Sequence, residues 1–148
     1  MVELITVMVL VGVLAAVAIP RMMDQDTTGP AVYGEQVVSA LRLAQKSAVA
    51  RRRTVCVTAT PASVTLRIRT QQGPGPCAAQ MDGVTDDLYA SKDSGIVLDG
   101  APPVMRFQPD GTITDQNDVR FGRLSLAILS AGAPRRTIVL DGGTGHVD

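Results

Sequence analysis

Residues 1–20, MVELITVMVLVGVLAAVAIP, decide the class of this protein. Only Glu3, Thr6, Gly12 and Pro20 interrupt the apolar residues, and Glu3 is the one charged side chain. A helix rises about 1.5 Å per residue, so this segment spans roughly 30 Å, the hydrocarbon thickness of a bilayer. The sequence therefore predicts a membrane helix over residues 1–22 that carries a carboxylate at its third residue.

A cleaved secretory signal peptide is the main alternative for this segment. Such a peptide has basic residues before a shorter apolar run and small residues at a cleavage site. No Lys or Arg precedes the run here, although Ala15, Ala16 and Ala18 are small enough to resemble a cleavage site. We favour an anchor that remains part of the protein.

The remainder of the chain divides into a junction over residues 23–30 and a globular domain over residues 31–148. The junction is polar and ends in Gly29-Pro30, which favours a turn. An apolar stripe at helical spacing follows and predicts an amphipathic helix that ends near three consecutive arginines, 51–53. The residues of the stripe are Tyr33, Val37, Ala40, Ala44 and Ala48.

After this helix the apolar residues recur with a period of two, which indicates β-strands. Residues 54–60 and 63–69 should form a hairpin, with Val64, Leu66 and Ile68 on one face and Thr65, Arg67 and Arg69 on the other. Further strands are expected at 95–98, 104–108, 124–129 and 137–140, and a short closing strand at 144–148. These elements predict an α+β fold.

Cys56 and Cys77 are the two cysteines of the chain. Disulfides persist on the outer side of a bacterial inner membrane, so we expect one bridge between them. It would close a loop of about 20 residues and contribute on the order of 3 kcal/mol. Two unpaired thiols, or half of a metal site, are the alternatives.

The segment Val2 to Pro20 resembles the N-terminal helix of type IV pilins and type II secretion pseudopilins, which commonly reads FTLIELhhVhhIhGILAAIAhP, with h apolar. EQVVSALRLAQKSAVARRRTVCV resembles the helix-to-strand passage of GspH/FimT-type minor pilins and pseudopilins. The opening helix, VMRFQPDGTI and RRTIVLDGGTGHVD resemble MSHA-type minor pilins in particular. The resemblance implies a pilin fold, with a long N-terminal helix, half in the membrane and half amphipathic, packed on an antiparallel sheet.

The resemblance also implies a role for Glu3. In this family the acid pairs with the α-amine at the start of a neighbouring subunit, so Glu3 would set the register of assembly. Membrane carboxylates usually mark such a functional partner. Gly12, Ala15, Ala16 and Pro20 would shape the helix packing, because small residues allow close approach of helices in membranes. A carboxylate at the headgroup boundary and small residues that merely face lipid are the alternatives.

Family members begin with Phe-Thr after a basic leader, so Glu3 corresponds to their fifth mature residue. We therefore expect a longer precursor, which prepilin peptidase cleaves, with the methylation usual for the family. The implied partners are other pilin or pseudopilin subunits. The implied location is the inner membrane, crossed once, with the globular domain in the periplasm before entry into a pilus or pseudopilus.

Other functions find little support in the sequence. Fourteen Lys+Arg balance 14 Asp+Glu, and the chain has two Tyr, two Phe and no Trp, so a broad nucleic-acid surface is not expected. Some FimT-type pilins capture DNA through C-terminal arginines; here Arg135 and Arg136, with residues 51–53, are the candidates. His146 lacks triad partners, and residues 115–118 lack calcium-loop spacing. We predict no catalytic residue, metal or cofactor.

The sequence thus predicts a structural minor pilin or pseudopilin that joins or primes a filament near its tip. A DNA-binding minor pilin and an uncleaved, membrane-anchored periplasmic protein are the alternative hypotheses.

Overall fold

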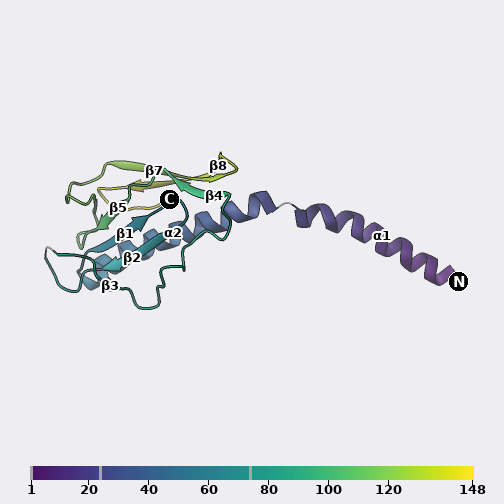
Figure 1. Ribbon diagram of the computed structural model, residues 1–148, viewed down its shortest axis with the longest axis horizontal. Helices are drawn as coiled ribbons and strands as arrows, with labels where there is room; N and C mark the ends of the chain where they lie inside the picture. The colour runs from purple at the N-terminus through teal and green to yellow at the C-terminus, as the bar shows by residue number, and fades with distance from the viewer. Residues whose placement is uncertain (1, 24, 74) are drawn as a thin grey trace.

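A computed structural model describes residues 2–23, 25–73 and 75–148, and the side chains of residues 2–16, 28–73 and 75–148. Two helices, α1 (Val2–Met23) and α2 (Gln25–Arg51), precede all the strands (Figure 1). The strands are β1 (Val55–Ala59), β2 (Val64–Ile68), β3 (Ala79–Gln80), β4 (Ile96–Asp99), β5 (Val104–Phe107), β6 (Ile113–Thr114), β7 (Arg123–Ser130) and β8 (Ala133–Asp141). The α+β prediction is confirmed.

The strands form two antiparallel sheets, where the sequence suggested one. One sheet has the order β3-β2-β1-β5-β6, and the other has the order β4-β7-β8. The expected hairpin is present, with Val55 opposite Ile68 and Ala59 opposite Val64. The long β7–β8 hairpin brings residues far from α2 in sequence back toward it, and both sheets contribute strands that contact α2.

The core lies between α2 and the sheets. The residues of the predicted α2 stripe are at most 3% exposed: Tyr33, Val37, Ala40, Ala44 and Ala48. They meet buried strand residues such as Val57, Leu66, Phe107 and Ile138. Three of the five stripe residues are alanines, so the helix backbone can approach the strands closely, and a larger side chain there would overpack the core.

The structure corrects the predicted start of the second helix. Gly29 and Pro30 lie inside α2, which begins at Gln25 rather than at residue 31. An interior proline disfavours a helix because it lacks an N–H group and crowds the preceding turn. Tertiary packing offsets that cost here: Pro30 is buried, and a Cβ added to Gly29 would lie 2.8 Å from Cδ1 of Ile96.

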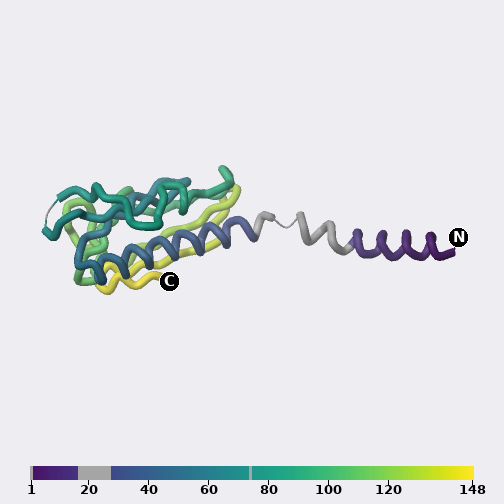
Figure 2. The backbone as a smooth tube through the Cα atoms, turned by 90° about the horizontal axis from the view of Figure 1, so that it is seen from below, coloured from purple at the N-terminus to yellow at the C-terminus, as the bar shows by residue number. Residues whose placement is uncertain are grey.

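The C-terminal residues fold back onto the body of the domain. Val139 and Asp148 exchange two backbone hydrogen bonds of 2.9 Å, and Leu140 bridges to Val147. Arg42 of α2 donates to the carbonyl of Val147 through Nε at 3.2 Å and Nη2 at 2.9 Å. Figure 2 shows the C-terminus beside α2. The expected closing strand is thus a single bridge rather than a full strand, fastened to α2 by an arginine.

Candidate assembly site

The described part of α1 lies outside the core (Figure 1). Its large apolar residues are between 55% and 76% exposed: Val2, Leu4, Ile5, Val7, Met8, Val9, Leu10, Val11, Val13 and Leu14. An apolar surface of this extent in a monomer marks an interaction with other proteins or with lipid. The helix is therefore the candidate assembly site.

Glu3 lies in the first turn of α1 and is exposed. Thr6 donates from Oγ1 to the backbone carbonyl oxygen of Glu3 at 2.8 Å. The side-chain carboxylate of Glu3 takes no part in this hydrogen bond. Among the described residues, no ion pair involves Glu3. Its position at the helix start is favourable for an acid, because the unpaired N–H groups there carry partial positive charge.

The small residues of α1 share a face. Gly12 and Ala16 are one turn apart, and Ala15 lies beside them. A Cβ added to Gly12 would meet nothing within 4 Å. Open space at this position allows a second helix to approach the backbone closely. The side chain of Pro20 lies outside the described residues.

Within the part of the chain whose side chains are described, no helix is both long and apolar enough to cross a membrane.

Cys56 and Cys77 form a disulfide with a Cα–Cα distance of 6.0 Å, as the sequence predicts. Cys56 lies in β1, and Cys77 follows the glycine- and proline-rich loop after β2. The bridge therefore fastens this loop to the centre of the larger sheet.

The two candidate DNA-contacting arginines are in different surroundings. Arg135 is exposed, whereas Nη1 of Arg136 pairs with Oε1 of Glu35 at 2.7 Å. A Cβ on Gly34 would lie 2.7 Å from Cδ of Arg136, so this glycine makes room for the arginine across α2. The arginines at the end of α2 begin 16 residues beyond Glu35, about 24 Å along the helix. Arg135 and Arg136 therefore do not form one patch with the arginines at residues 51–53.

A groove lies near the start of the globular part of α2. Its volume is about 330 Å³, and its lining includes Val32, Tyr33 and Ile96. The Tyr33 hydroxyl is buried and has no hydrogen-bond partner within the described part of the structure. Burial disfavours the phenolate and raises the pKa of Tyr33.

Sequence reasoning missed Arg69, which was expected on the solvent side of its strand. Alternation along β2 is correct, but Arg69 is only 8% exposed. Its Nη1 donates hydrogen bonds to the hydroxyl of Thr54, which precedes β1, and to the carbonyl of Gly73 in the loop after β2. The glycine- and proline-rich loop, tied back by Cys77, was the only available signal that this end of the strand would be covered.

A family model for the type II transport protein GspH matches residues 34–144. This chain belongs to the GspH family. Two crystal structures of the type IV minor pilin FimU from Pseudomonas aeruginosa have the same fold. Both FimU chains are 16% identical to this chain, and each alignment covers 79% of it. The alignments cover 84% and 89% of the two FimU chains, with TM-scores of 0.55 and 0.50, respectively. No curated protein matches this GspH-family chain. The fold is that of these minor pilins.

Proposed function

We propose that this GspH-family protein is a structural subunit that joins or primes a type IV pilus or a type II secretion pseudopilus near its tip. The observation that carries the proposal is an exposed apolar α1, with Glu3 in its first turn, attached to a head of pilin fold. The apolar side chains of this helix must be buried away from water. Lipid buries them before assembly, and the helices of neighbouring subunits bury them in the filament.

Location follows from the same proposal. The chain is held in the inner membrane by its N-terminal helix, with the head in the periplasm, and prepilin peptidase acts on its precursor. The Cys56–Cys77 disulfide supports this placement, because disulfides persist in the oxidising periplasm and are rare in the cytosol.

Glu3 has the central role in assembly. A carboxylate in an apolar setting is stabilised by a cation, and the proposed cation is the α-amine of the adjoining subunit. A buried charge left without its partner is strongly unfavourable, so only one axial stagger between neighbours satisfies both groups. Head-to-tail contacts of this kind do not close and therefore build a filament.

The test is substitution of Glu3 by Ala in the producing cell. E3A should remain in the membrane fraction and be lost from sheared filaments, both measured by immunoblot. Glu35→Ala removes an exposed acid from the head and is the matched control, which should still enter filaments. Filament incorporation of E3A at the level of the natural protein would favour the alternative of a tethered periplasmic protein.

DNA binding is the weaker alternative. The Arg136–Glu35 ion pair already satisfies one of the two candidate cations. Binding of duplex DNA that falls steeply with salt and is lost in Arg135→Gln would revive it.

A further inference from the structure

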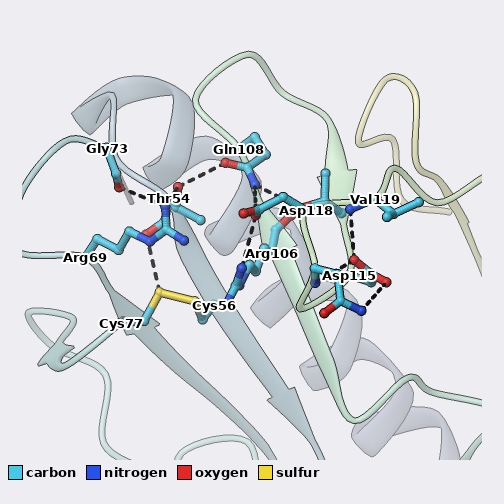
Figure 3. A network of polar contacts seen from close by, with 12 residues as sticks. Thr54, Cys56, Arg69, Gly73, Cys77, Arg106, Gln108, Asp115, Asp118 and Val119 are labelled. Carbon is cyan, nitrogen blue, oxygen red and sulfur yellow. Dashed lines mark hydrogen bonds and ion pairs between the residues drawn. A yellow bond between two sulfur atoms is a disulfide. The ribbon is translucent and has the colours of Figure 1, made fainter. Parts of the chain in front are cut away.

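A polar cleft lies where α2 ends, at the far end of the head from the groove beside Tyr33. Its volume is about 240 Å³, and three of its lining residues are arginines. The lining is Arg52, Arg53, Thr54, Arg69, Gln72, Gly73, Gln108 and Pro109. No Asp or Glu belongs to this described lining, so the cleft has an excess of positive charge. Figure 3 shows Arg69 and its neighbours.

Arg69 is the buried cation of this cleft. Its Nη1 donates to Gly73 O at 2.9 Å and to Thr54 Oγ1 at 3.3 Å, and both acceptors are neutral. Its Nε is buried without a partner in the described structure. Neither the ion pairs nor the hydrogen bonds of the described residues give Arg69 a carboxylate. A guanidinium that is more than nine-tenths buried is stabilised by a counter-charge in contact with it, and no carboxylate of the described residues makes that contact.

The nearby acids are bound to other groups. Asp118 pairs through Oδ1 with Nη1 of Arg106 at 3.1 Å, and the same oxygen accepts from Nε2 of Gln108. Asp110, which lines the adjoining hollow with Arg52, accepts from the backbone N–H and hydroxyl of Thr112 at 2.9 and 2.7 Å. Both acids share with Arg69 the lining of a separate hollow of about 620 Å³, but neither forms an ion pair or a hydrogen bond with its guanidinium within the described residues.

The end of α2 adds cations to the rim. Arg52 and Arg53 are exposed, and their N–H groups bond to the carbonyls of Val49 and Ala48. Arg52 has a φ of 50°, at a helix-end position where glycine is usual. The helix dipole opposes an anion here, but its effect is confined to the last turn, and three full positive charges outweigh it.

We propose that this cleft binds one oxyanion group, a carboxylate or a phosphate, with Arg69 at its base and Arg52 and Arg53 at its rim. Planar guanidinium groups match both anions, and Gln72 offers a further amide donor beside them. The cleft volume suits a single such group and is below the usual range for larger ligands.

Thermal unfolding of the full chain in an uncharged detergent, followed by circular dichroism, tests the proposal. Sodium phosphate and sodium acetate are each compared with sodium chloride at equal ionic strength. Binding to the folded state raises Tm, and we expect a rise of about 5 °C at ~100 mM of the preferred anion. A larger rise in phosphate or in acetate identifies which of the two groups the site prefers.

Variants separate site binding from general salt effects, which act on any protein. Arg69→Gln should remove the anion-dependent rise, whatever its own Tm. Arg67→Gln is the matched control: Arg67 lies in β2, two residues before Arg69, and pairs with Asp86 at the surface, so this variant should keep the rise. Arg53→Gln removes only an exposed rim cation and should reduce the rise without altering Tm in chloride. Equal anion responses in the natural chain and in Arg69→Gln would overturn the proposal, as would no response in the natural chain.

Discussion

At the residue scale, Asp141 organises the last turn of the chain. Its Oδ1 accepts from the N–H groups of Gly143 and Thr144 at 2.9 and 3.0 Å, and from the Thr144 hydroxyl at 3.2 Å. These bonds favour the carboxylate and hold the pKa of Asp141 below its usual value. This turn also allows the N–H of Asp141 to donate to the carbonyl of His146. That hydrogen bond begins the segment in which the C-terminus folds back along β8.

A pH-dependent stability difference follows from this lowered pKa. A carboxyl whose pKa is lower when folded contributes stability above its unfolded pKa, and that contribution is lost as pH falls through the folded pKa. Asp141→Asn should therefore lower Tm at pH 7, and its Tm should converge with that of the natural chain as pH falls through the lowered pKa of Asp141. Circular dichroism melts across pH measure this. Asp99→Asn, an exposed acid at the end of β4, is the control and should leave the Tm profile unchanged.

The alanines of α2 show how single residues set the distance between layers. Ala40, Ala44 and Ala48 are fully buried and bring the helix backbone close to the strands. Sequence periodicity predicted this face, because burial on a helix repeats every 3.6 residues whatever the partner is. The identity of the partner, two sheets rather than one, depends on strand pairings that periodicity does not contain.

At the element scale, the disulfide joins an irregular loop to β1. The bridge spans 21 residues, which include β2 and the loop that covers Arg69. A covalent link of this length restricts the unfolded chain much more than the folded one. Gly73, whose carbonyl accepts from Arg69, lies within the segment that the bridge closes.

Removal of the disulfide should therefore destabilise the head. Replacement of Cys56 and Cys77 by Ser should reduce the free energy of unfolding by about 3 kcal/mol. Denaturant titration with and without a reductant measures the difference, and the natural chain in reductant should resemble the double variant. An unchanged denaturation midpoint in reductant would contradict a stabilising bridge.

At the scale of the whole molecule, Gly142 connects the two sheets. Its carbonyl accepts from the N–H of Ile113 in β6 at 2.8 Å, and its own N–H donates to the carbonyl of Gly122 at 2.8 Å. A Cβ at this position would collide with the carbonyl of Phe121. The close approach of three backbone segments therefore requires a residue without a side chain.

Gly142→Ala should disturb this junction. We expect a loss of about 1–3 kcal/mol in stability, because the backbone atoms that crowd the new methyl group must shift. Gly122→Ala is a matched control in the same junction, since a Cβ there would meet nothing within 4 Å. Thermal unfolding of both variants measures the contrast, and equal Tm values would refute the close-packed junction.

The molecule as a whole combines a compact head with an exposed apolar helix. Strand pairing provides hydrogen-bond partners for backbone groups of the head. Arg42 of α2 holds the C-terminal segment by a hydrogen bond to the carbonyl of Val147. The described part of α1 has no such internal partner. This contrast is the physical basis of the proposed role, because stability lies in the head and association lies in α1.

The sequence by itself determined the features that repeat or stand alone: the apolar run with Glu3, the α2 stripe, the alternation in β1 and β2, and the cysteine pair. Each depends on local geometry or on residue type. Tertiary structure alone decided that Pro30 lies within a helix, that two residues at Ile113 form β6, and that Arg69 is buried. Those outcomes depend on which distant segments meet, and contact free energies between distant segments outweigh local preferences of about 1–3 kcal/mol.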